Sequence, residues 1–287
     1  MSGGMAIAGA PISWGVCEVP GWGAQLPPER VLAEMRDAGL TATEFGPDGY
    51  LPDAPDAKAA LLRSYGLRAV GGFVPVVLHD AAVDPMPDVE RALAAFAATG
   101  ATTLVLAAAT GRDGYDARPE LDAAAWRVLL GRLDAINTRA ADDGVTATLH
   151  PHVGTIVETA AEVDRVLDGS AVALCLDTGH LLVGGTDPVA LAERVPGRIA
   201  HVHLKDVDAG LAADVRAGRR PYSDAVRDGM FRPLGAGDVD IARVVRALDG
   251  AGYTGWYVLE QDVMLAGADE DPLADVAAGI RYLGALT

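Results

Sequence analysis

Residues 171–206, AVALCLDTGHLLVGGTDPVALAERVPGRIAHVHLKD, contain the pattern that decides the fold. Two short apolar runs, Ala171–Asp177 and Ile199–Leu204, flank a segment with a helical pattern, Pro188–Arg194. Short apolar runs bounded by Gly, Asp or Pro are typical of strands that are buried on both faces. The stretch therefore predicts a strand–helix–strand unit with two parallel strands.

The same unit recurs along the whole chain. The other predicted strands are Met5–Ile12, Thr41–Phe45, Arg68–Val77, Thr102–Ala108, Val145–His150 and Trp256–Gln261. The other predicted helices are Pro28–Ala38, Ala59–Tyr65, Val89–Ala98, Ala123–Ala141, Ala161–Leu167, Ile241–Leu248 and Ala274–Leu283. A glycine follows five of these helices, and we expect a left-handed cap at each: Gly39, Gly66, Gly100, Gly144 and Gly252.

Eight such units predict an α/β fold, a single (β/α)8 TIM barrel over residues 1–287. An open, doubly wound sheet is the main alternative. It would ordinarily have fewer strands and a glycine-rich first turn, whereas residues 13–23, SWGVCEVPGWG, lack the GxGxxG pattern.

Composition limits the partners of this chain. Lys+Arg number 23 and Asp+Glu 40, so the formal net charge is −17, which argues against nucleic acid or an anionic membrane as a partner. Two isolated cysteines, Cys17 and Cys175, fit a reducing compartment. We see no basic leader and no apolar stretch of about 18 residues, so we expect a cytoplasmic protein. A homo-oligomer stays possible.

Polar residues gather at the ends of the predicted strands, where a barrel of this kind builds its active site. All six histidines lie at or just beyond a strand, and several acidic residues and one lysine join them. These residues are Glu44, His79, His150, His152, Asp177, His180, His201, His203, Lys205, Glu260 and Asp262. The pattern predicts a catalytic or binding site at this end of the barrel.

Four of these residues form a candidate metal site, because they end four consecutive strands: His150, Asp177, His203 and Glu260. Taken alone, a residue such as His201 is more often a core histidine, and an aspartate after a strand more often caps a helix. Asp206 fits that second description. Two carboxylates buried close together are costly unless a cation compensates. Imidazole and carboxylate ligands favour Mn²⁺ or Co²⁺, with Zn²⁺, Fe²⁺ and Mg²⁺ as alternatives.

Several segments resemble a known superfamily. CLDTGH (175–180), HVHLKD (201–206), FRPLGAGDVDI (231–241) and LEQD (259–262) resemble the sugar phosphate isomerase/epimerase superfamily, whose members are xylose isomerase-like barrels related to endonuclease IV. APISWGVCEVPGWG (10–23), TEFGPDGYLP (43–52), LHPHVGT (149–155) and ETAAEVDRVLD (158–168) are similar to the inosose dehydratases within it.

The resemblance implies metal ligands at Asp177, His203 and Glu260. Many epimerases of the superfamily have a glutamate at the strand-five position, and it exchanges a proton with the last glutamate across the substrate carbon. Here that position is His150, so one partner of the pair is missing and epimerisation is disfavoured. The related endonucleases use a three-metal cluster and bind a polyanion, which does not suit a chain of charge −17.

Lys205 and His152 are the candidate catalytic pair for eliminating water from a β-hydroxy ketone. Lys205 lies two residues after His203, so both point to the same side of a strand, and a lysine beside a metal can have a lowered pKa and act as a base. His152 lies beside His150 if the strand continues through Pro151, and it would then protonate the leaving hydroxyl. The assignment of base and acid stays open. Superfamily dehydratases that act on dehydroshikimate resemble this chain in having a His and a Lys at these positions.

The remaining candidates are substrate contacts: Glu44, His79, His180, Trp14 and Arg232. Trp22 is a further aromatic in the first loop. Residues Ala209–Pro233 are charged and poorly periodic and fit a lid, in which Arg219, Arg220 and Arg232 could meet a phosphate. The sequence thus predicts a metal-dependent dehydratase of a cyclic polyol ketone such as 2-keto-myo-inositol. A sugar or sugar-phosphate isomerase or epimerase, and a non-catalytic, metal-dependent polyol-binding barrel, are the alternatives.

Overall fold

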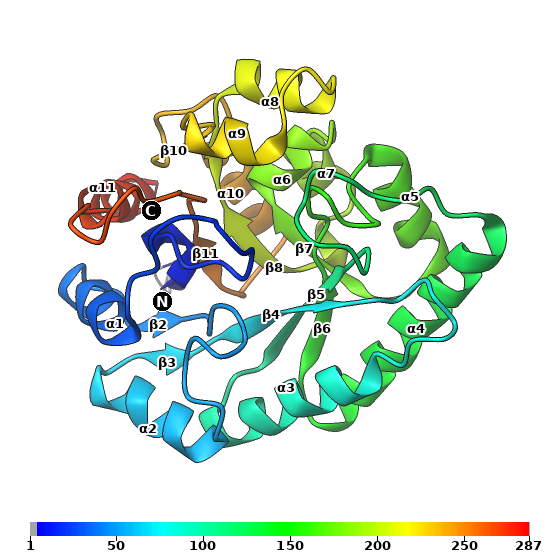
Figure 1. Ribbon diagram of the computed structural model, residues 1–287, viewed down its shortest axis with the longest axis horizontal. Helices are drawn as coiled ribbons and strands as arrows, with labels where there is room; N and C mark the ends of the chain where they lie inside the picture. The colour runs from blue at the N-terminus through cyan, green and yellow to red at the C-terminus, as the bar shows by residue number, and fades with distance from the viewer. Residues whose placement is uncertain (1–4, 287) are drawn as a thin grey trace.

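Strands and helices alternate around a central barrel in the computed structural model, which describes residues 5–286 (Figure 1). The strands are β1 (Ile7–Gly9), β2 (Ala42–Thr43), β3 (Arg68–Ala69), β4 (Gly71–Val76), β5 (Thr103–Ala108), β6 (Thr146–Leu149), β7 (Ala173–Asp177), β8 (Ile199–Leu204), β9 (Asp206–Val207), β10 (Phe231–Arg232) and β11 (Tyr257–Leu259). The α-helices are α1 (Pro28–Asp37), α2 (Pro55–Ser64), α3 (Met86–Thr99), α4 (Ala123–Asp142), α5 (Ala160–Gly169), α6 (Thr178–Val183), α7 (Pro188–Arg194), α8 (Ala209–Arg216), α9 (Tyr222–Arg227), α10 (Ile241–Gly250) and α11 (Leu273–Gly284).

The barrel is a ring of parallel strands in the order β3-β2-β1-β11-β8-β7-β6-β5-β4. β3 and β4 belong to one extended run that is interrupted at Val70. β3 pairs with β2 and β4 pairs with β5, so the chain itself joins the two ends of the sheet. Val70 adds to this closure, since its N–H donates to Thr43 and its carbonyl accepts from Thr103. The predicted xylose isomerase-like TIM barrel is confirmed, and the open sheet is excluded.

Local sequence patterns predicted most helices and strands close to where the structure has them. β8 and α7 have the predicted bounds, and all five predicted cap glycines have φ between 71° and 89°. β1 is shorter than predicted because the chain turns into a 3-10 helix at Pro11–Trp14. β6 ends at Leu149, one residue short of the predicted end at His150, so the condition that the strand continues through Pro151 is not met.

The lid segment, residues 209–233, has more regular structure than its sequence suggested. α8 begins after Asp208, whose side chain accepts from the Gly210 and Leu211 amides. α9 follows, and β10 pairs antiparallel with β9. Figure 1 shows α8 and α9 (yellow) together at one end of the ring of strands.

Three apolar clusters lie among the described residues, and two of them hold the layers together. The larger one lies between the strands and the surrounding helices and includes Leu106, Leu133 and Phe96. A smaller one joins the lid segment to the barrel and includes Tyr222 and Phe231. Within residues 5–286, no helix combines the length and apolar content needed to cross a membrane.

Candidate functional site

The four predicted metal ligands converge at the carboxyl ends of the strands. Asp177 pairs with His203 in the β7–β8 register, and the Glu260 N–H donates to Leu204 at the end of β8. Asp177 Oδ2 lies 3.2 Å from His150 Nε2 and 3.6 Å from His203 Nδ1. Glu260 Oε2 lies 3.2 Å from the same His203 nitrogen. These four residues, here called the ligand cluster, are all buried.

Asp177 uses its two carboxylate oxygens for different purposes. Oδ1 accepts from the amides of Gly179 and His180, which caps the N-terminus of α6. Oδ2 faces His150 and His203. The same residue can therefore cap the helix and still offer an oxygen to a cation, because capping needs only one oxygen. Asp206, by contrast, is structural, since it accepts from the amides of Gly235, Gly237 and Val239.

Glu44 lies behind the ligand cluster and fixes the orientation of His203. Its Oε1 lies 2.7 Å from His201 Nε2 and 3.1 Å from His203 Nε2. Because Glu44 engages Nε2 of His203, Nδ1 is the ring nitrogen that faces Asp177 and Glu260. Burial opposes ionisation of Glu44, but the charge of His203 and the hydrogen bonds from both histidines hold its pKa below the ordinary value. Glu44, predicted to contact substrate, also lines the pocket.

The residues present fit a divalent ion. Asp177, His203 and Glu260 each offer one ligand atom, and these atoms lie within 4.8 Å of one another. His150 Nδ1 is buried without a hydrogen-bond partner among the described residues. Four buried carboxylates, those of Glu44, Asp177, Glu260 and Asp262, crowd into one region, and such an arrangement needs cations nearby. This buried histidine–carboxylate set has the composition of a transition-metal site.

Lys205 lies among three of these carboxylates. Its Nζ is 2.7 Å from Asp262 Oδ1, 3.0 Å from Glu260 Oε2 and 3.4 Å from Asp177 Oδ2. Burial opposes a charged amine, but the three carboxylates together raise the pKa of Lys205 well above its ordinary value. The expected lowering of the Lys205 pKa is not found among these side chains, because the three carboxylates favour the charged amine.

His152 has the opposite character. Burial, followed by the charge of His150, lowers its pKa well below the ordinary value, so its imidazole is neutral. Nδ1 lies 2.7 Å from the Val153 carbonyl oxygen and must carry the proton in that contact, which leaves the lone pair on Nε2. The His152 ring packs on that of His180, with centroids 3.7 Å apart. His180 Nε2 in turn lies 2.9 Å from Lys205 Nζ and accepts from it.

A pocket with a mixed lining opens above these groups. Trp22, Phe73 and Tyr115 form apolar walls, and Tyr115 packs on His152 with a centroid distance of 4.6 Å. The polar lining is Glu18, Glu44, His150, His152, His203, Lys205, Glu260 and Asp262. Aromatic faces beside several hydrogen-bonding groups suit a small polyhydroxylated ring.

Four residues predicted to contact substrate do not line this pocket: Trp14, His79, His180 and Arg232. His180 lies against His152 and Lys205. Trp14 is fully buried in the core, because the 3-10 helix after β1 turns its indole N–H to Glu34 of α1. His79 lies in a loop that is held against α4 by Arg132, which donates to the carbonyl of Leu78. Arg232 is paired with Asp208 at 3.2 Å. Arg219 and Arg220 are paired with lid aspartates too, so the lid arginines are engaged within the lid.

Four residues at the site had no role in the sequence-based prediction. Tyr115 comes from the loop before α4, and Tyr222 of the lid donates to Asp262 at 2.8 Å. The sequence shows Asp262 just after the last strand, but only the structure shows that it pairs with Lys205. Cys175 lies beneath the ligand cluster. No local pattern marks the two tyrosines, because Tyr115 lies in a loop and Tyr222 begins the short helix α9 in a poorly periodic segment.

Fold and site together define a TIM barrel with a buried histidine–carboxylate centre at the carboxyl ends of its strands. The chain belongs to the Xylose isomerase-like TIM barrel family, which matches residues 32–286. It is 36% identical to the rhizopine catabolism protein MocC of Rhizobium meliloti, over 93% of this chain and 82% of that protein. It is 31% identical to the inosose dehydratase of Geobacillus thermodenitrificans, over 92% and 89% of the two chains. Its fold matches the structure of the IOLI protein with a bound zinc atom, with a TM-score of 0.73 at 13% identity and 98% coverage of both chains.

Proposed function

We propose that this protein is a metal-dependent dehydratase that eliminates water from a cyclic polyol ketone, with 2-keto-myo-inositol as the expected substrate. The observation that carries the proposal is geometric: His152 and Lys205 line the same pocket as the ligand cluster, and both contact His180. An elimination needs one proton acceptor and one proton donor, and this pocket offers one of each. The similarity to inosose dehydratases, at 31% identity in the example above, supports the choice of substrate.

In this proposal the roles of the catalytic pair are assigned from their protonation. His152 Nε2 takes the proton from the carbon next to the ketone, because its lone pair is free and its imidazole is neutral. Lys205 gives a proton to the departing hydroxyl and is held in place by Asp262. His150, Asp177, His203 and Glu260 would hold a divalent ion, with Mn²⁺ or Co²⁺ the expected species, and the ion would supply Lewis-acid stabilisation of the charge that develops on the ketone oxygen.

The remaining residues of the site position the catalytic pair and the ring. His180 supports both catalytic side chains, since its ring packs on His152 and accepts from Lys205. Tyr115 and Trp22 offer faces for the carbocycle, and Glu18 is a hydrogen-bond acceptor at the pocket wall. The residue that follows β6 is His150. This position therefore has no carboxylate for a two-glutamate proton exchange.

The test is the reaction of purified, Mn²⁺- or Co²⁺-loaded protein with 2-keto-myo-inositol, followed by ultraviolet absorbance of the dione product and by mass spectrometry. We expect the loss of one water per turnover. His152→Gln and Lys205→Met should each lower the rate by about 10²-fold or more, the scale of a lost general acid or base. His79→Gln, a histidine outside the pocket, is the matched control.

Interconversion of ketose epimers without an unsaturated or dione product would overturn the proposal in favour of an epimerase. Binding of metal and polyol with no turnover would indicate a binding protein.

A further inference from the structure

The thiol of Cys175 lies inside the barrel, directly beneath the ligand cluster. Cys175 is two residues before Asp177 on β7, so both side chains point to the same face of the strand. The register shifts by one residue between Leu174 and Cys175, where Leu174 pairs with Ile199 but Cys175 pairs with His201. A bulge of this kind re-aims the side chains that follow it. Here it places Cys175 one layer below the Asp177–His203 pair.

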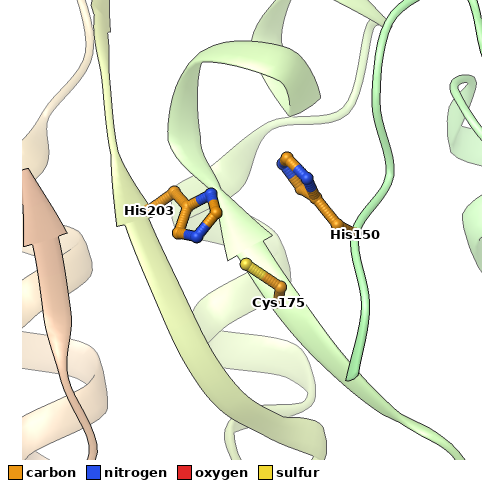
Figure 2. Close-up of side chains that lie close together, drawn as sticks. All are labelled: His150, Cys175 and His203. Atoms are coloured by element: carbon orange, nitrogen blue, oxygen red, sulfur yellow. The ribbon is translucent and has the colours of Figure 1, made fainter. Parts of the chain in front are cut away.

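Two imidazoles face this thiol. Cys175 Sγ, a ring nitrogen of His150 and a ring nitrogen of His203 all lie within 4.8 Å of one another. Figure 2 shows the thiol on β7 and both rings turned toward the same space. All three side chains are buried. Zn–S and Zn–N bond lengths place the donors of one tetrahedral ion roughly 3.5 Å apart, so a movement of about one ångström would bring this trio to ligand spacing.

His150 also has a ring nitrogen that no described residue satisfies. His150 Nδ1 is buried and has no hydrogen-bond partner among residues 5–286, while Nε2 of the same ring contacts Asp177. A buried ring nitrogen without a partner is costly, and bound metal is one of the few occupants that satisfies it. A cysteine that only fills space is usually surrounded by aliphatic side chains, whereas this one faces two histidines.

We propose that Cys175 is a sulfur donor to an ion held by His150 and His203, so that the thiol raises the affinity of the centre for thiophilic ions such as Zn²⁺ and Co²⁺ more than its affinity for Mn²⁺ or Mg²⁺. The ion replaces the thiol proton, which leaves to solvent, and the resulting thiolate adds one negative charge to the donor set. Soft sulfur strengthens binding of Zn²⁺ and Co²⁺ and does little for harder ions. The inference rests on the metal centre of the proposed function and not on its reaction.

The chain offers a clean test because it has only two cysteines. In Cys17→Ser, Cys175 is the sole thiol, and its own surroundings are untouched. Titration of this variant with Co²⁺ should produce visible d–d bands, which report bound ion, together with a near-ultraviolet thiolate-to-cobalt charge-transfer band. Cys175→Ser should keep the d–d bands and lose the charge-transfer band. Its affinity for Zn²⁺ should fall by roughly tenfold or more, and its affinity for Mn²⁺ should change little.

The outcomes separate the thiol from the centre as a whole. Cobalt d–d bands without a charge-transfer band in Cys17→Ser would overturn the role of Cys175 and leave the metal centre standing. A charge-transfer band that survives in Cys175→Ser would also overturn it. No cobalt binding by the parent protein would refute the centre and the sulfur ligand together. The spectrum of Cys17→Ser alone decides whether Cys175 binds cobalt. The test therefore holds even if Cys175→Ser folds poorly.

Discussion

Lys205 and a divalent ion compensate the same buried carboxylates. Each should therefore contribute more to the stability of the fold when the other is absent. Replacing Lys205 with Met keeps most of the side-chain volume but removes an ammonium that stands 2.7, 3.0 and 3.4 Å from three carboxylates. Removing one partner of a buried ion pair costs about 3–5 kcal/mol. For a domain of this size, each kcal/mol corresponds to about 2–4 °C in melting temperature. We therefore expect the chelator-treated variant to melt on the order of 10 °C below the parent.

Metal should restore much of this loss. An ion bound by Asp177 and Glu260 compensates two of the three carboxylates, and a ligand that binds only the native state stabilises it by mass action. The rise in melting temperature on adding Mn²⁺ or Co²⁺ should accordingly be larger in Lys205→Met than in the parent, by on the order of 5 °C. The assay is thermal unfolding of both proteins, with chelator and then with a saturating ion.

The control is the other lysine of the chain. Lys58 on α2 lies over the Phe45 ring, 4.7 Å from its centroid, so Lys58→Met should shift the melting temperature by about 2 °C or less. The reasoning is refuted if chelator-treated Lys205→Met melts within that margin of the parent. It is also refuted if metal raises the melting temperature of both proteins equally.

Three further predictions concern other parts of the site and fold. Glu260→Gln removes a charge from the ligand cluster and should lower bound metal and abolish turnover, measured by elemental analysis and by the dione assay; normal metal content would place Glu260 outside the ligand set. Tyr222→Phe removes a hydrogen bond to a buried carboxylate, a loss of about 1.5–3 kcal/mol, so its melting temperature should fall by several degrees while metal content stays unchanged. Glu162→Ala breaks the capping box of α5 and the ion pair with Arg118; chemical denaturation should show a loss of about 1–2 kcal/mol, and an unchanged midpoint would rule out this cap as a stabilising feature.

The sequence by itself determined the architecture of this protein. Alternating apolar runs and amphipathic segments are local patterns, and eight of them in one chain leave few arrangements other than a closed barrel. Cap glycines such as Gly39 and Gly144 were equally readable, because a left-handed residue between helix and strand is a local requirement. The position of His150, Asp177, His203 and Glu260 at strand ends followed from the same patterns, since parallel strands place their carboxyl ends together.

The tertiary structure alone decided what each polar group does. The protonation of Lys205 depends on Asp262 and Glu260, which lie far away in sequence, so its spacing from His203 suggested a lowered pKa where the structure gives a raised one. The direction of the Trp14 side chain could not be predicted from the sequence either. The turn after β1 directs its ring to Glu34 rather than to the pocket. Electrostatic fields and side-chain directions arise from residues brought together by folding. No pattern along the chain carries that information.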